Sequence, residues 1–370
     1  MENSSLISKK IDNKSYFIFL KNSKKFLIAS NFHLKLFNDF YKISKKNLLL
    51  NISTKFPISN TNDIYSELEE LLKSSVPISV KPEKNYVIPK HLKSFKFKIG
   101  TSFTTIYYDD LEIINTVIGQ LFHLENNTIH KSINYYVFKN KGRYFLNNDK
   151  ENLGSWNKKE IHYLTGKLMS LIMCDFHEIP EKKWSGFLHA SAVSKVSNAF
   201  VIVGKSGNGK STSSAILSNF GYDLLCDDIT PISRDGQIGN FPNSISIKEP
   251  SFEKIHLLFN KKKLSYTINI SKGKIKYLNP HGLTNFSPST IKCSNIIWIK
   301  YDPAKESSIE RLELKNILPL IVNESFFPTN LKSVKGFMNW FVKCNCHKII
   351  YNNDESLIDF FEEINGFASS

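Results

Sequence analysis

The sequence lacks the features that mark membrane-spanning and disulfide-stabilised chains. Its 370 residues hold no apolar run that approaches the roughly 18 residues of a membrane-spanning helix. The first residues lack the basic and then apolar layout of a signal peptide. The cysteines number only five, an odd count, and follow no regular spacing, so a disulfide framework is not expected. These absences favour a cytoplasmic protein that has no membrane partner.

Charge of one sign is not concentrated in either half of the chain. The net charge of +15 is spread over residues 1–180, with 26 basic and 17 acidic side chains, and residues 181–370, with 23 and 17. The strongest local excess is Lys254–Lys300, with nine lysines and no acidic residue. Such a stretch is usually a solvated face, although it can also attract anionic ligands. No motif for reading RNA or DNA accompanies it, so nucleic acid is not the expected partner.

A glycine-rich stretch in the second half matches the pattern G-x-x-x-x-G-K-[ST] at every fixed position. It consists of Gly204, Lys205, Ser206, Gly207, Asn208, Gly209, Lys210 and Ser211. Glycines let backbone N–H groups wrap closely around phosphates. In this pattern Lys210 reaches the terminal phosphates of a nucleotide, and the Ser211 hydroxyl is placed to bind Mg²⁺.

The residues on either side of this loop fit the same interpretation. Ala199–Val203 is an apolar run that predicts a buried strand, and Ser211–Phe220 has helical spacing and is followed by Gly221. A helix that begins at the loop adds the positive end of its dipole to the anion site, next to Thr212. The sequence therefore predicts that the chain binds a nucleoside triphosphate.

Two further groups of residues have the chemistry of phosphoryl transfer. Asp227 and Asp228 follow a predicted short strand, Tyr222–Cys226, where one carboxylate can hold Mg²⁺ and the other can accept the proton of an attacking hydroxyl. We favour Asp227 as the base and Asp228 as the metal ligand. However, neighbours on a strand point to opposite faces, so sequence alone does not decide between them. His189 is predicted on a strand, Gly186–Val193, that precedes the loop strand and could bring its imidazole near the phosphates.

These residues also resemble a known family. The segments Leu188–Ala192, Gly204–Thr212 and Leu225–Asp228 resemble the catalytic domain of HPr kinase/phosphorylase, and more closely the wider group of HPr-kinase-related proteins. Phe241–Lys248 and Cys346–Tyr351 are similar to further segments of those relatives. In that family a histidine, the loop lysine and an aspartate pair occur in this order. The resemblance covers about residues 184–365.

The resemblance implies an α/β nucleotide domain of the phosphoenolpyruvate-carboxykinase type that uses ATP and Mg²⁺ to phosphorylate a hydroxyl, with His189 assisting the aspartates. Some features differ from the enzymes that act on HPr. Thr212 stands where they have a glutamate, their glycine-rich signature is absent, and Glu249 or Glu253 would have to serve as their metal-binding glutamate. HPr itself is therefore not the expected acceptor.

The region before residue 181 carries no nameable motif. Its patterns predict strands at 16–20, 26–29, 95–99, 104–108, 134–138 and 143–146, and helices at 63–73 and 158–176. We expect an α+β domain at residues 1–180 for acceptor recognition or homo-oligomerisation, and an HPr-kinase-like domain at residues 181–370. The expected function is an ATP-dependent kinase acting on a hydroxyl, such as serine, of a peptide, protein or small molecule. The alternative is a nucleotide-binding regulatory module without transferase activity.

Overall fold

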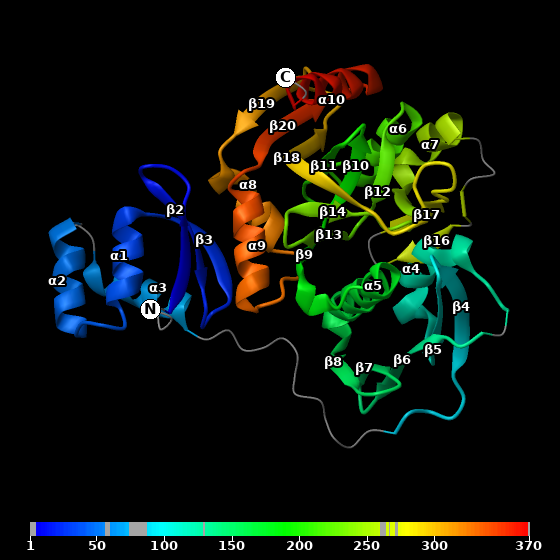
Figure 1. Ribbon diagram of the computed structural model, residues 1–370, viewed down its shortest axis with the longest axis horizontal. Coiled ribbons are helices and arrows are strands. Elements are labelled where there is room, and N and C mark those ends of the chain that lie inside the picture. Colours follow the sequence, from blue (N-terminus) through cyan, green and yellow to red (C-terminus); the bar gives the residue numbers. More distant parts are fainter. Residues whose placement is uncertain are drawn as a thin grey trace. The chain divides into compact units, whose positions relative to one another are not determined.

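The computed structural model describes residues 5–55, 60–73, 87–128, 130–259, 264–265, 267–270 and 273–368 (Figure 1). The chain is a mixed α/β protein with several sheets, and it divides into two compact units. One unit comprises Met1–Ile78 with Leu314–Leu318, and the other comprises Ser79–Glu313 with Pro319–Ser370. Within the described residues, every helix is too short or too polar to cross a lipid bilayer.

The first unit pairs a three-stranded antiparallel sheet with helices. The apolar sides of β2, α1, α2 and α3 enclose one core that includes Ile18, Leu36, Ile52 and Leu68. The expected pair of strands at 16–20 and 26–29 is confirmed. The elements are β1 (Leu6–Lys10), β2 (Ser15–Leu20), β3 (Lys25–Ser30), α1 (Asn31–Asp39), α2 (Lys45–Lys55) and α3 (Thr61–Leu72).

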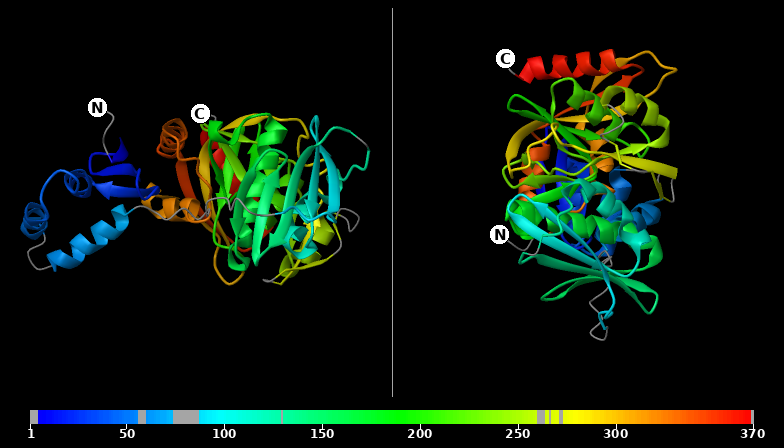
Figure 2. Two further views of the ribbon diagram at one scale, coloured as in Figure 1. Left: turned by 90° about the horizontal axis from the view of Figure 1, so that it is seen from below. Right: turned by 90° about the vertical axis from the view of Figure 1, so that its right-hand side faces the viewer.

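The second unit begins with a five-stranded sheet in the order β4-β5-β6-β7-β8. Its predicted hairpin and its long helix are both present, and α5 packs on the sheet through residues such as Leu164 and Leu168 (Figures 1 and 2). β5 and β6 are parallel, and α4 lies in the long crossover connection that a parallel pair requires. The elements are β4 (Lys93–Ile99), β5 (Ser102–Tyr108), α4 (Leu111–Leu121), β6 (Ile133–Asn140), β7 (Arg143–Asn148), β8 (Asn152–Trp156) and α5 (Ile161–His177).

A nine-stranded sheet forms the centre of this unit. Its order is β12-β10-β11-β18-β14-β13-β9, and β20 pairs with both β18 and β19. β11, β18 and β20 are parallel, and β11 is nearly continuously apolar, as a strand covered on both faces is. The strands are β9 (Trp184–Leu188), β10 (Ser191–Lys195), β11 (Asn198–Val203), β12 (Asp223–Cys226), β13 (Thr230–Ser233), β14 (Gln237–Gly239), β18 (Thr290–Tyr301), β19 (Ser308–Leu312) and β20 (Asn345–Tyr351).

Helices and a small sheet pack around this centre. α6 and α10 share one core with β10, β11, β18 and β20, built from residues such as Ile202, Ile216, Ile297 and Phe361. A three-stranded antiparallel sheet in the order β15-β17-β16 lies beside α6 and α7. The remaining elements are α6 (Lys210–Asn219), β15 (Ile245–Lys248), α7 (Phe252–Phe259), β16 (Ile268–Ile270), β17 (Gly273–Leu278), α8 (Leu314–Val322), α9 (Leu331–Phe341) and α10 (Asp354–Ala368).

The boundary between the units does not coincide with the division expected near residue 180. The reason is that the region before residue 180 is bonded to the region after it. His177 Nε2 lies 2.8 Å from the carbonyl oxygen of Asn240, and the Tyr277 hydroxyl donates to the carbonyl oxygen of Thr116 at 3.2 Å. Residues 87–180 therefore belong to the same compact unit as the glycine-rich loop.

The strand predicted at Gly186–Val193 is two strands in the structure, and this prediction was wrong. β9 ends at Leu188 and β10 begins at Ser191. The break arises because the two strands pair with different neighbours, β9 with β13 and β10 with β11 and β12. A tight turn joins them, in which Ala190 N–H donates to the Leu188 carbonyl at 3.0 Å. His189 thus lies in a turn rather than on a strand.

Candidate functional site

The glycine-rich loop joins β11 to α6, so the predicted strand, loop and helix are all present. Gly204 passes so close to β18 that an added Cβ would lie 2.9 Å from the Ile299 carbonyl oxygen. Gly209 precedes α6 with a φ of +94°, which glycine adopts without strain. The first N–H groups of α6 therefore open onto the loop, as an anion site requires.

Lys210 is the first residue of α6, and only 9% of it is exposed. Its Nζ donates to the carbonyl oxygen of Gly204 at 2.8 Å, across the loop. Burial lowers the pKa of this amine, while the carboxylates of Asp228 and Asp227 act in the opposite direction. The predicted lysine and both predicted aspartates are thus close enough to interact.

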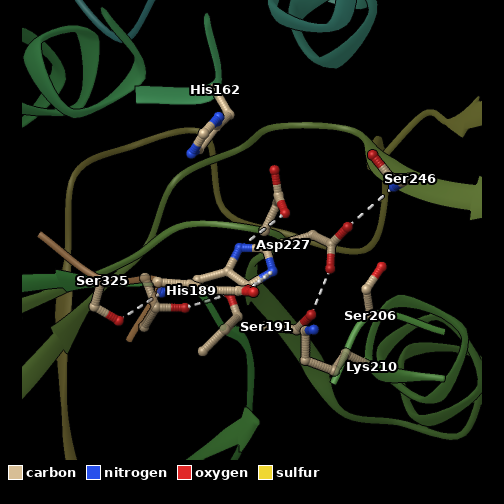
Figure 3. Close-up of polar contacts among 12 residues, drawn as sticks. His162, His189, Ser191, Ser206, Lys210, Asp227, Ser246 and Ser325 are labelled. Atoms are coloured by element: carbon tan, nitrogen blue, oxygen red, sulfur yellow. Dashed lines mark hydrogen bonds and ion pairs between the residues drawn. The ribbon is translucent and has the colours of Figure 1, made fainter. Parts of the chain in front are cut away.

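Asp227 follows β12 and is fully buried. One carboxylate oxygen accepts from the Ser191 hydroxyl, and the other accepts from Ser246 N–H at 3.0 Å (Figure 3). Burial, followed by the charge of Asp228, raises the pKa of this carboxyl group, whereas hydrogen bonds that include one from the Ser211 hydroxyl lower it. The structure therefore brings Asp227 to Ser211, the residue predicted to bind Mg²⁺.

Asp228 has different surroundings, because its side chain is 47% exposed. Its backbone lies in the left-handed region at a φ of +68°, where aspartate is tolerated better than most residues. Oδ2 accepts from Gln120 Nε2 of α4 at 3.1 Å, and Oδ1 lies 3.3 Å from His189 Nδ1. Its carboxylate is thus oriented from two sides and still reaches solvent.

His189 is held by residues from a distant part of the chain. Its Nε2 lies 3.4 Å from Glu324 Oε2, and its backbone N–H donates to Ser325 Oγ at 3.0 Å (Figure 3). Next to this contact, Phe326 exchanges backbone hydrogen bonds of 2.8 and 2.9 Å with Phe187 of β9. Segment 324–326 is therefore fastened to the edge of β9, and it places a carboxylate beside the imidazole.

Six residues at this site had no role in the sequence analysis: Gln120, Ser191, Ser246, Lys248, Glu324 and Ser325. Ser191, Ser246 and Lys248 lie inside segments that carried the family resemblance, which was a usable signal. Gln120, Glu324 and Ser325 lay outside those segments and gave no signal. Gln120 is 108 residues from Asp228, and Glu324 and Ser325 are further still from His189.

Other predicted residues lie apart from the aspartates. Glu249 pairs with Lys274 at 3.1 Å, and Glu253 lies in the first turn of α7. Across the described ranges, no hydrogen bond or ion pair joins either glutamate to Asp227 or Asp228. In the stretch Lys254–Lys300, Lys254 pairs with Asp354 and Lys300 with Asp302, while lysines 261–263 and 272 lie outside the described residues.

The chain was compared with known proteins. No family model matches it, and no curated protein matches it. Among solved structures, it is similar to the Hpr(Ser) kinase/phosphatase from Coxiella burnetii, with 14% identity and a TM-score of 0.22. The match covers 48% of this chain and 97% of that chain. A TM-score this low does not establish a shared fold.

Proposed function

We propose that this protein is an ATP-dependent phosphotransferase that moves a γ-phosphoryl group to a hydroxyl, such as serine, of a peptide, protein or small molecule. One observation carries the proposal. Next to the loop lysine stand two neighbouring carboxylates with opposite surroundings: Asp227 is buried beside Ser211, and Asp228 is half exposed. Phosphoryl transfer needs two such groups, one for the metal and one for the acceptor.

The residues beside the loop fit Mg²⁺. Asp227 and Ser211 offer oxygen atoms only, and Mg²⁺ in nucleotide sites is held by one or two carboxylates together with phosphates and water. The ionised form of a fully buried carboxylate also needs a positive neighbour, which a divalent cation supplies. When bound, Mg²⁺ neutralises charge on the phosphates. Lys210 and the N-terminus of α6 add positive charge from the protein.

We assign the base to Asp228 and the metal contact to Asp227, which reverses the preference drawn from sequence. Asp227 is fully buried and each of its oxygens accepts a hydrogen bond inside the protein, so of the two carboxylates it is the one less open to an incoming acceptor. Asp228 can receive a proton because its carboxylate reaches solvent. In the transfer, the acceptor O–H bond breaks, its proton passes to Asp228, and the acceptor oxygen bonds to the γ-phosphorus as the bond to ADP breaks.

His189 and Gln120 support this base rather than replace it. Each approaches a different oxygen of Asp228, so the carboxylate is held in one orientation. A carboxylate that is already oriented loses less freedom when the acceptor docks. Because Gln120 belongs to α4, the region before residue 181 contributes to the site, in keeping with the acceptor-recognition role proposed for it.

The test is ADP formation from ATP, measured with and without fractions of a cell lysate as the source of acceptor, with γ-labelled ATP to trap the product. A phosphotransferase gives acceptor-dependent ADP and a labelled product, and Asp228→Asn lowers both on the order of 10²- to 10⁴-fold. ATP binding without acceptor-dependent turnover would instead identify the nucleotide-dependent regulatory module.

A further inference from the structure

The segment that follows Asn243 contacts the glycine-rich loop and the residues on either side of it. Ser246 N–H donates to Asp227 Oδ2 at 3.0 Å, and Lys248 Nζ donates to Ser206 Oγ at 2.9 Å. A little further on, the Thr212 hydroxyl donates to Ser251 Oγ at 3.1 Å. The contacts reach Asp227, the first half of the loop and the first turn of α6. This segment is therefore a wall of the phosphate site.

Lys248 occupies a defined place in this wall. It is the last residue of β15, and its partner across the small sheet is Ile275. Two residues earlier on the same strand, the backbone N–H of Ser246 contacts Asp227. The Lys248 amine reaches the loop itself, through its bond to Ser206.

The charge of Lys248 is not neutralised by the surrounding protein. Throughout the described part of the chain, no carboxylate pairs with it, whereas its neighbour Lys274 pairs with Glu249 at 3.1 Å. Its charge is also close enough to Lys210 to contribute to the lowered pKa of that amine. The positive charges of the two amines repel each other, and an anion bound by both would offset this electrostatic repulsion.

We propose that Lys248 is a second phosphate-binding cation, which contacts the terminal phosphate of a nucleoside triphosphate together with Lys210. This inference rests on the proposed nucleotide site. Ser206 lies in the first half of the loop, on the Gly204 side that Lys210 Nζ also contacts. An ammonium group has three donors, so Lys248 can keep its bond to Ser206 and still donate to a phosphate oxygen.

The experiment compares MgATP and MgADP affinities by calorimetry for the parent and three variants. Lys248→Gln keeps a donor for Ser206 but removes the charge, Lys248→Arg keeps the charge, and Lys274→Gln removes a lysine from the adjacent strand. A charge-assisted hydrogen bond predicts that Lys248→Gln weakens MgATP binding about 10- to 100-fold and MgADP binding less. Lys248→Arg should restore most of the MgATP affinity, and Lys274→Gln should change it less than about twofold, as expected for an exposed ion pair.

Three results would overturn the inference: unchanged MgATP affinity in Lys248→Gln, equal losses for MgATP and MgADP, or equal losses in Lys248→Gln and Lys274→Gln. Melting temperatures without nucleotide check the fold, and they should agree because Lys248 is exposed. Lys210→Ala in the same series separates this inference from the proposed function. If the parent binds MgATP and Lys210→Ala does not, the nucleotide site stands whatever Lys248→Gln does.

Discussion

The two sides of the candidate site are built in different ways. On the nucleotide side, Lys210, Ser211 and Asp227 lie within 18 positions of one another, and Ser246 follows shortly after. On the acceptor side, Asp228 depends on Gln120 and His189, and His189 depends on Glu324 and Ser325. The first arrangement is local in sequence, whereas the second exists only once the chain has folded. The proposed phosphate-binding residues follow from the motif, while the orientation of the proposed base, Asp228, follows from tertiary structure.

The two carboxylates show the energetic side of this difference. Asp227 is buried and satisfied by hydrogen bonds within the protein, so a change there affects stability as well as function. Asp228 is half exposed, and its φ of +68° is a conformation that costs a non-glycine residue about 1 kcal/mol. Such strain persists at functional sites because the surrounding structure enforces it. We therefore expect changes on the nucleotide side to impair nucleotide binding, and changes on the acceptor side to impair phosphoryl transfer while nucleotide binding is kept.

The largest effect is expected on the nucleotide side, from Lys210→Ala. This change removes the amine that spans the loop, so nucleotide-induced stabilisation should be lost. The measurement is thermal unfolding with and without MgATP. Without nucleotide the melting temperature should barely move, because within the described residues the amine makes one hydrogen bond, to the Gly204 carbonyl. A variant that MgATP stabilises as well as the parent would refute the phosphate-binding role of the loop.

The next effect separates the aspartates. Asp228→Asn should lower phosphoryl transfer on the order of 10²- to 10⁴-fold while leaving MgATP affinity close to that of the parent, because it removes a base. Asp227→Asn should weaken MgATP binding and also lower the melting temperature, because it alters a buried, hydrogen-bonded carboxylate. Calorimetry and an acceptor assay on both variants decide the matter. The reverse pattern would restore Asp227 as the base.

The dependence of activity on metal should be set by the residues on the nucleotide side, Ser211 and Asp227. Activity should vanish in EDTA and return with Mg²⁺ or Mn²⁺. Ser211→Ala should raise the Mg²⁺ concentration needed severalfold, since it removes a hydroxyl next to Asp227. Thr212→Val is the matched control, because the Thr212 hydroxyl contacts Ser251 instead. Full activity in EDTA would exclude a metal-assisted transfer.

A smaller effect is expected from Gln120→Leu on the acceptor side. Asp228 loses its neutral donor, and a hydrogen bond to a charged group implies about a tenfold loss of transfer. MgATP affinity should not change. Gln120→Glu should cost more than Gln120→Leu, because it places a like charge against Asp228. If the two variants transfer equally well, the contact does not orient the base.

The nucleotide side could be predicted from sequence more completely than the acceptor side. The loop, its strand and helix, the aspartate pair and the small hairpins follow local spacing, and these elements are present at nearly the expected residues. The break at His189 was missed because β9 and β10 have different partners, which no local pattern encodes. The attachment of residues 87–180 to the loop unit was missed for the same reason, since it depends on single contacts such as that of His177 with Asn240.

The smallest effect on activity is expected at the contact that ties the two sides together. His123, just after the helix that carries Gln120, lies 2.9 Å from the Pro242 carbonyl through Nε2 and 2.9 Å from Ser244 Oγ through Nδ1. That segment leads into β15 on the nucleotide side. Burial lowers the pKa of His123 from 6.5 to about 4. His123→Gln should therefore change stability and its pH dependence but leave transfer nearly unchanged.

The sign of the pH dependence follows from that shift. Between pH 6.5 and 4 the unfolded chain binds a proton at His123 that the folded protein does not, so the contribution of His123 to stability is present above pH 6.5 and is lost as the pH falls. By pH 5 the loss is roughly 2 kcal/mol, at about 1.4 kcal/mol per pKa unit. Asp175, whose pKa burial raises to about 6, acts in the opposite direction over this range, so the measurement must be a difference. Unfolding free energies of the parent and His123→Gln, compared at pH 7.5 and pH 5, cancel the Asp175 contribution. The gap between the two proteins should narrow toward pH 5, and a constant gap would show that His123 is not held neutral by the fold.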